Sequence, residues 1–166
     1  MEAEWNGYRL TDNELQALLA YTGGTLVGLQ IGTGDVTELK EGLLLLQEKG
    51  FFFHAEDGEM LEKVISFVIY ELGNADQCLL FEAENECTAG LYSCAHMWIF
   101  LAKRRGVWQL FPLPSLEEAW TVFQQYQAGV NGLFYLYSDD QVRVLDSREQ
   151  YQIKDILQSW VTRREE

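Results

Sequence analysis

The stretch that decides the fold lies at residues 98–111 and reads WIFLAKRRGVWQLF. Two runs rich in aromatic and apolar residues flank Arg104-Arg105-Gly106, a short polar segment that is typical of a tight turn. Strands that are joined by so short a connection pair in the antiparallel sense. The stretch therefore predicts a β-hairpin, and with it an antiparallel sheet.

Further strands are predicted on both sides of this hairpin. Residues 77–83 and 90–103 are rich in aromatic and apolar residues of the kind that strands use. Near the C-terminus, residues 133–137 and 142–145 form a second predicted hairpin that turns through residues 138–141. Together these segments predict a sheet of about five strands.

Capping boxes predict where several helices begin. In Thr11-Asp12-Asn13-Glu14, the Thr side chain can accept from the Glu amide while the Glu side chain reaches back, which predicts a helix over about 11–21. A second box at Asp35-Val36-Thr37-Glu38 predicts a helix through Lys49, with Gly50 as its left-handed cap. A third box at Ser115-Leu116-Glu117-Glu118 predicts a helix that ends near Tyr126.

Two more helices follow from apolar spacing. Between about Glu59 and Leu72, apolar residues recur at helical intervals. Near the C-terminus, Ser147 with Gln150 is expected to cap a final helix. A short extended segment is also expected over residues 26–31.

The order of these elements predicts an α+β fold, in which an N-terminal helical layer packs with the antiparallel sheet and a C-terminal helix. Helices and strands come in runs, without the regular alternation that builds parallel sheets. No linker rich in Pro, Gly or Ser divides the chain. We therefore expect residues 1–166 to form a single domain, helix-rich over 1–75 and sheet-rich over 76–166.

The negative charge is strongly uneven. The net charge is −14, and residues 1–90 carry −13 of it, with 17 Asp and Glu against 4 Lys and Arg. So acidic a surface repels phosphate backbones, which excludes nucleic acid as an expected partner and favours basic ones. The same charge is also compatible with an acidic face that only aids solubility.

Catalytic and metal-binding patterns are lacking. The two histidines, His54 and His96, fall in predicted apolar strands, where packing is the simpler interpretation. The cysteines Cys78, Cys87 and Cys94 form no CxxC pair, and their odd number suits a disulfide framework poorly. We therefore expect no enzyme, with no catalytic residues, no metal and no cofactor. A site of unrecognised type near His96 is the alternative.

The sequence also indicates a compartment. No run approaches the roughly 20 apolar residues of a membrane helix, so the protein is not expected to be membrane-integral. The first residues, Met1-Glu2-Ala3-Glu4-Trp5, are acidic and do not look like a signal peptide. A cytoplasmic location is expected.

The order of motifs resembles a known family. Six features carry the likeness. They are Leu10-Thr11-Asp12-Asn13-Glu14-Leu15, a short strand to Gly34, an Asp-capped helix ending in Gln47-Glu48-Lys49-Gly50-Phe51, a helix near Leu61–Leu72, the 98–106 strand and turn, and Val107–Pro114 leading into helix 115–126. Over residues 8–125 this pattern is similar to the EspG-type chaperones of type VII (ESX) secretion and to small proteins encoded with such systems.

The resemblance implies a cytosolic, non-enzymatic chaperone that binds a helical secretion substrate and keeps its apolar tip from aggregating. The chain is closer to one half of the pseudo-symmetric family fold, so a homodimer could supply the other half. Since the likeness rests on pattern and turn placement, it carries over no site residues.

Candidate binding residues come from charge and from exposed aromatic side chains. Glu38, Glu41 and Glu48 lie on the predicted second helix, where they could attract a basic partner. Tyr135 and Tyr137 alternate with apolar residues in a strand that is bulky on both faces, so one face is either covered or offered to a partner. An acidic immunity protein that neutralises a toxin domain is the alternative function.

Overall fold

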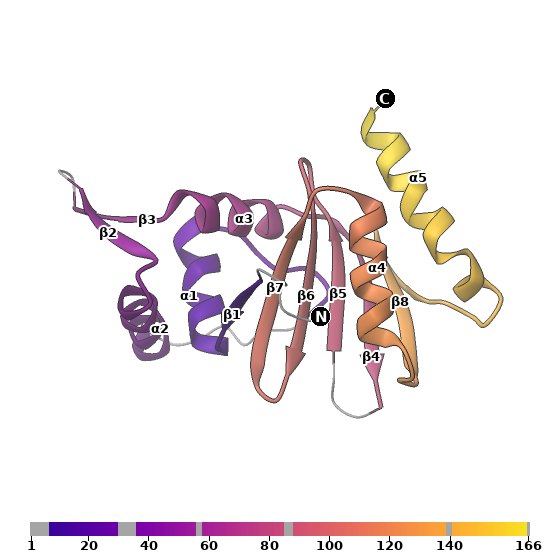
Figure 1. The fold of residues 1–166 in the computed structure, drawn as a ribbon, viewed down its shortest axis with the longest axis horizontal. Coiled ribbons are helices and arrows are strands. Elements are labelled where there is room, and N and C mark those ends of the chain that lie inside the picture. The colour runs from indigo at the N-terminus through magenta and orange to yellow at the C-terminus, as the bar shows by residue number, and fades with distance from the viewer. Residues whose placement is uncertain (1–6, 30–35, 56–57, 85–87, 139–140, 166) are drawn as a thin grey trace.

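The computed structural model describes residues 7–29, 36–55, 58–84, 88–138 and 141–165. It has the predicted α+β fold, with five α-helices and a seven-stranded antiparallel sheet that carries helices on both faces (Figure 1). The elements in chain order are β1 (Tyr8–Leu10), α1 (Asp12–Thr22), α2 (Val36–Glu48), β2 (Phe52–Ala55), β3 (Gly58–Leu61), α3 (Lys63–Gly73), β4 (Gln77–Ala83), β5 (Thr88–Ser93), β6 (Trp98–Arg104), β7 (Val107–Leu113), α4 (Leu116–Gln127), β8 (Gly132–Ser138), β9 (Gln141–Val144), the 3₁₀ turn η1 (Glu149–Gln152) and α5 (Ile153–Glu165).

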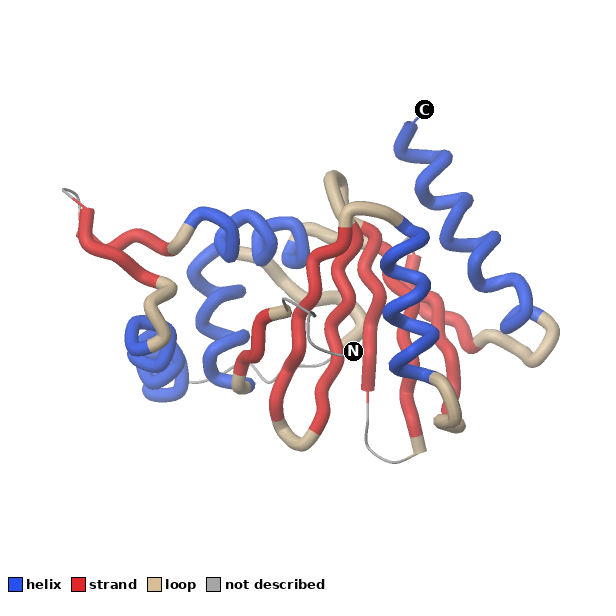
Figure 2. The backbone as a smooth tube through the Cα atoms, viewed as in Figure 1, coloured by secondary structure: helices blue, strands red, loops and turns tan. Residues whose placement is uncertain are grey.

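The strands of the large sheet are ordered β1-β7-β6-β5-β4-β8-β9, and each pairs antiparallel with its neighbours. The decisive hairpin is confirmed as β6 and β7. Its turn needs left-handed backbone, which Arg105 and Gly106 supply with φ of 52° and 78°. A separate two-stranded ribbon, β2–β3, projects from one end of the molecule (Figure 2).

The predicted count of about five strands was too low. The sequence predicts one strand over residues 90–103, but this segment belongs to β5 and β6, which flank a turn at residues 94–97. In that turn the Cys94 N–H donates to the Met97 carbonyl at 3.0 Å. His96 therefore lies in an exposed turn and not in an apolar strand. The short edge strand β1 was not predicted at all.

Two predicted helix starts are wrong, and one expected segment lacks a strand. Residues 58–61 form β3 and pair with β2, so α3 begins at Lys63 with Glu62 as its N-cap. Before α5, the reciprocal cap joins Asp146 and Glu149, one residue earlier than the expected pair of Ser147 and Gln150. Residues 26–29 form no strand, and residues 30–31 lie outside the described part of the chain.

The other helix signals hold. Thr11 and Glu14 form the predicted capping box of α1, and Ser115 caps α4 by accepting from the Glu118 amide at 3.3 Å. Gly50 is left-handed after α2, with φ of 82°. Asp35, the expected cap of α2, lies outside the described residues.

One face of the sheet is covered by the N-terminal helices. Their core cluster joins α1, α3 and the inward side chains of β4 to β7, among them Leu15, Ile65 and Tyr92. Residues 27–29 also lie on this face, where the Tyr92 hydroxyl donates to the Val27 carbonyl at 2.6 Å. The helix α2 packs on α1, and a Cβ at Gly42 would lie 2.2 Å from the Asn13 carbonyl oxygen, so only glycine allows this approach.

The opposite face is covered by α4 and α5. Its core cluster is rich in aromatic residues, with Phe81, Phe100 and Phe123 packed edge to face. Leu157 and Trp160 of α5 complete the cluster. The molecule is thus a three-layer sandwich in which both faces of the sheet are largely buried. Within the described residues, no helix has the length and apolar character needed to cross a membrane.

Candidate protein-binding surfaces

The three acidic candidates lie together on the outer side of α2. Glu38, Glu41 and Glu48 are all exposed, and they share one helix face with Leu45 at intervals of three and four residues. Leu44 is exposed beside them. Leu46 is fully buried against α1, so the acidic stripe points away from the core. This face combines negative charge with two exposed leucines.

An ion pair between the partly exposed Lys49 and the buried Glu14 fixes the end of α2. The Lys49 ammonium donates to Glu14 Oε1 at 2.8 Å and lies as close to Oε2, which itself accepts no hydrogen bond. The same ammonium donates to the Arg9 carbonyl at 2.9 Å. Since Glu14 is completely buried and also caps α1, Lys49 ties α2 to both α1 and β1.

The outward face of α3 carries several large exposed apolar side chains. Ile65, Val68, Ile69 and Leu72 point into the core. The opposite side presents Phe67 and Tyr70, which are 47% and 55% exposed, with Val64 at its margin. Lys63 and Ser66 are the polar residues that accompany them. Large exposed aromatic residues in a row are typical of protein interfaces.

His96 links this helix to the β5–β6 turn. Its ring Nδ1 lies 2.6 Å from Oε1 of Glu71, and its backbone N–H donates to the same oxygen at 3.1 Å. Glu71 is buried, whereas the His96 side chain is exposed and packs against the Phe67 ring at a centroid distance of 5.9 Å. His96 thus joins the β5–β6 turn to Glu71 of α3 and packs beside the exposed ring of Phe67. The side chain of His54 lies outside the described part of the structure.

Tyr135 and Tyr137 lie on β8, on the face of the sheet that α1 and α3 cover elsewhere. Both are half-buried against that core cluster. By register they lie beside Val144 and Val142 of the edge strand β9. Neither helix reaches this corner, so Leu133, Val142 and Val144 remain exposed there.

The predicted binding residues therefore form two groups rather than one site. The α2 glutamates lie at one end of the long axis and β8 at the other (Figure 1). The sheet is bulky on both faces at β8, as predicted, and helices cover most of both. On the α1 and α3 side, the β8–β9 corner exposes Leu133, Val142 and Val144.

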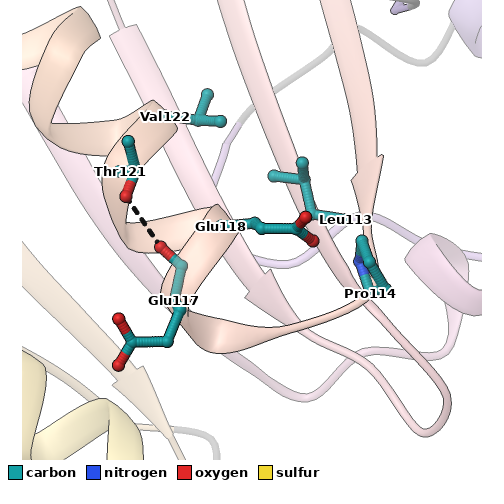
Figure 3. A pocket seen from close by; sticks show the side chains of 6 residues that line it. All are labelled: Leu113, Pro114, Glu117, Glu118, Thr121 and Val122. Carbon is teal, nitrogen blue, oxygen red and sulfur yellow. Dashed lines mark hydrogen bonds between the residues drawn. The ribbon is translucent and has the colours of Figure 1, made fainter.

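Two shallow depressions flank the start of α4. One, of about 410 Å³, is lined by Leu113, Pro114, Glu117, Glu118, Thr121 and Val122 (Figure 3). Figure 3 shows Glu118 extended toward Leu113 and Pro114 while the Glu117 side chain points away, where it pairs with Lys154 at 3.1 Å. The two carboxylates do not converge on a common point.

The other depression, of about 500 Å³, runs from residues 95–98 to α5 and includes His96. It is open, and the imidazole there is engaged with Glu71. Across the described residues, no group of three or more His, Cys, Asp or Glu side chains gathers where a metal ion could bind.

Comparison with known proteins adds no assignment, because the chain matches no family model and no curated protein.

The α3 surface and the β9 edge were missed by sequence reasoning. Val64 keeps helical spacing with the buried residues Val68 and Leu72, but it is itself exposed. The signal was present in the sequence of the helix, since Phe67 and Tyr70 fall opposite Ile65 and Leu72 and bring aromatic side chains to the outward face. For β9, the alternation Val142-Arg143-Val144 places both valines on one face of the sheet. Whether helices cover that face depends on the tertiary structure, which the alternation does not reveal.

Proposed function

We propose that this protein is a non-enzymatic adaptor or chaperone that binds a helical secretion substrate in the cytosol, in a system of the type VII (ESX) kind. The observation that carries the proposal is the outward face of α3. It exposes Phe67 and Tyr70 on a rigid helix whose opposite side is embedded in the core. An amphipathic partner helix can lay its apolar face on such a surface.

The acidic stripe on α2 supports the choice of partner. Glu38, Glu41 and Glu48 belong to the half of the chain that carries −13 of the net charge of −14. Negative surface potential steers basic partners into productive encounters even when the charges remain outside the final contact. The proposed partner is therefore an amphipathic helix with lysine or arginine beside its apolar face.

Co-expression with any small helical proteins that are encoded beside this gene tests the proposal. We expect one of them to bind with a Kd below about 10 μM, a typical range for a transient complex. Absence of binding by all of them at micromolar concentrations would refute the chaperone role. If a complex forms but substitutions on the outward face of α3 leave its affinity unchanged, that face is not the binding site.

The net charge favours one alternative. A compact protein with a charge of −14 could also neutralise a basic toxin domain, as an immunity protein does. Protection of cells from a neighbouring toxin gene, with secretion unchanged, would support this function over the first.

A further inference from the structure

The free edge of β9 presents unused backbone groups. The Leu145 N–H donates to the Phe134 carbonyl at 2.9 Å, so this pair exchanges hydrogen bonds between β9 and β8. Hydrogen-bonded and non-hydrogen-bonded pairs alternate along an antiparallel ladder. The backbone N–H and C=O groups of Arg143, two residues before Leu145, therefore also point toward β8. The N–H and C=O groups of Val142 and Val144 must then point away from the sheet.

An apolar surface adjoins this edge. Val142 and Val144 are 55% and 53% exposed, and by register they continue the row of Tyr137 and Tyr135 on β8. Leu133 extends the same face and is also exposed. Glu82, opposite Leu133, is the one charged side chain that the described residues of β4, β8 and β9 place on this face.

The other edge of the sheet is protected in ways that β9 is not. The strand β1 has only three residues, and Leu10 is fully buried beneath α1. The Lys49 ammonium donates to the Arg9 carbonyl there. Within the described part of the chain, no side chain bonds to the backbone of Val142 or Val144. β9 contains no proline, and its one charged residue, Arg143, lies on the opposite face of the sheet from the valines and pairs with Glu149.

We propose that β9 is a second binding site, which accepts an extended segment of another protein as an eighth strand of the sheet. The segment would bond to the outward groups of Val142 and Val144 and place alternate apolar side chains against Leu133 and the valines. Basic residues would flank its apolar core, because Glu82 borders the surface and the chain as a whole carries −14. This site is separate from the α3 face and goes beyond the proposed helix-binding function.

A second copy of the chain fits the edge less well. Antiparallel pairing through Val142 and Val144 would pair each valine with the other valine of the second copy. The Arg143 side chains of the two copies would then lie directly opposite each other, which is unfavourable. Two chains that each carry −14 would also repel one another.

Hydrogen exchange of the full chain with a synthetic peptide tests the proposal. The probe alternates valine and threonine between terminal lysines. A second peptide carries glutamate in place of lysine, and a third is the lysine peptide with alternate backbone nitrogens methylated. We expect the lysine peptide to slow exchange of the Val142 and Val144 amides at least about 10-fold, and the other two peptides to bind at least about 10-fold more weakly.

Surface variants add an independent readout. Val142→Lys with Val144→Lys should abolish peptide binding, and the milder Val142→Thr with Val144→Thr should leave the amide protection pattern in place at lower affinity. Tyr151→Lys, which replaces an exposed side chain (93%) outside both proposed surfaces, should leave peptide binding unchanged. Failure of the lysine peptide to protect the two amides would overturn the proposal. So would a dimer of the free protein in which both amides are already protected, and neither result would bear on the α3 face.

Discussion

Lys49 places its ammonium 2.8 Å from the fully buried carboxylate of Glu14, which also caps the first turn of α1. The pair joins residues that lie 35 positions apart in the sequence. Through it, the end of α2 is held against the start of α1, and the acidic outer stripe of α2 acquires a fixed direction. The contact is therefore a structural support for the surface that we expect to attract a basic partner.

Removing the lysine should be costly. In Lys49→Met, the buried carboxylate of Glu14 loses the one cationic partner that it has within the described residues. An uncompensated buried charge destabilises a protein strongly, and we expect the free energy of unfolding to fall by about 2–3 kcal/mol, because Lys49 itself is partly exposed. Urea denaturation measures this. The double variant Glu14→Gln/Lys49→Met should recover part of the lost free energy of unfolding. If the effects of the two single substitutions on that free energy simply add, Glu14 and Lys49 are not coupled.

A pH-dependent contribution is expected from the N-cap of α3. The Val64 and Ile65 amides donate to the Glu62 carboxylate at 3.0 and 2.9 Å, and these bonds lower the pKa of Glu62 below its usual value. Because the folded-state pKa is the lower one, the cap stabilises the fold above the unfolded pKa, and this contribution is lost as pH falls through the folded pKa. Glu62→Gln should therefore be less stable than the parent at pH 7, and the difference should shrink below about pH 4. A difference that stays constant with pH would contradict this role.

Local signals in the sequence predicted the helix starts best. The capping boxes at Thr11 and Ser115 rest on hydrogen bonds between residues three positions apart. Tertiary contacts with distant parts of the chain therefore have little influence on them. The antiparallel sheet followed from its hairpins for the same reason. The residues after Gly58 fit both the helical period and the alternation of a strand, because the segment is short. The sequence therefore predicts a helix where pairing with β2 makes the strand β3.

The candidate surfaces were harder to predict. The exposure of Glu38, Glu41 and Glu48 follows from helix periodicity once Leu46 is placed inside. Phe67 and Tyr70 look like core residues until the packing of α1 and the sheet on the other side of α3 is known. Likewise, the exposure of Val142 depends on how far the helices extend across the sheet, which no local pattern encodes.

The thiols of Cys78 and Cys94 should be unreactive in the folded protein. Both are buried, and burial raises the pKa of the Cys78 thiol well above its ordinary value despite a hydrogen bond with Tyr92. In a Cys87→Ser variant, an aromatic disulfide reagent should label neither cysteine at pH 8 without denaturant, and both in urea. We expect the native rate to be at least about 100-fold lower. Rapid stoichiometric labelling of the native variant would show that this core opens readily.

Charge reversal on α2 should act on the association rate. Replacing Glu38, Glu41 and Glu48 together by lysine should slow association with a basic helical partner about 10-fold at low salt and flatten its salt dependence. Stopped-flow kinetics at several ionic strengths measures both. A triple reversal at Glu84, Glu117 and Asp155, which are exposed on other parts of the molecule, changes the net charge equally. Equal slowing by the two triples would mean that total charge, and not the α2 stripe, guides the partner.

The central claim is that the chain binds another protein through the outward face of α3, and one affinity measurement tests it most directly. Phe67→Ser with Tyr70→Ser removes both aromatic side chains from that face, and Tyr151→Ser removes a tyrosine that is 93% exposed near α5. Calorimetric titration with a helical partner should show a Kd at least about 30-fold weaker for the α3 variant, because aromatic anchors carry about 2 kcal/mol or more of binding energy. The Tyr151 variant should bind like the parent. Equal affinity of all three proteins would contradict the account.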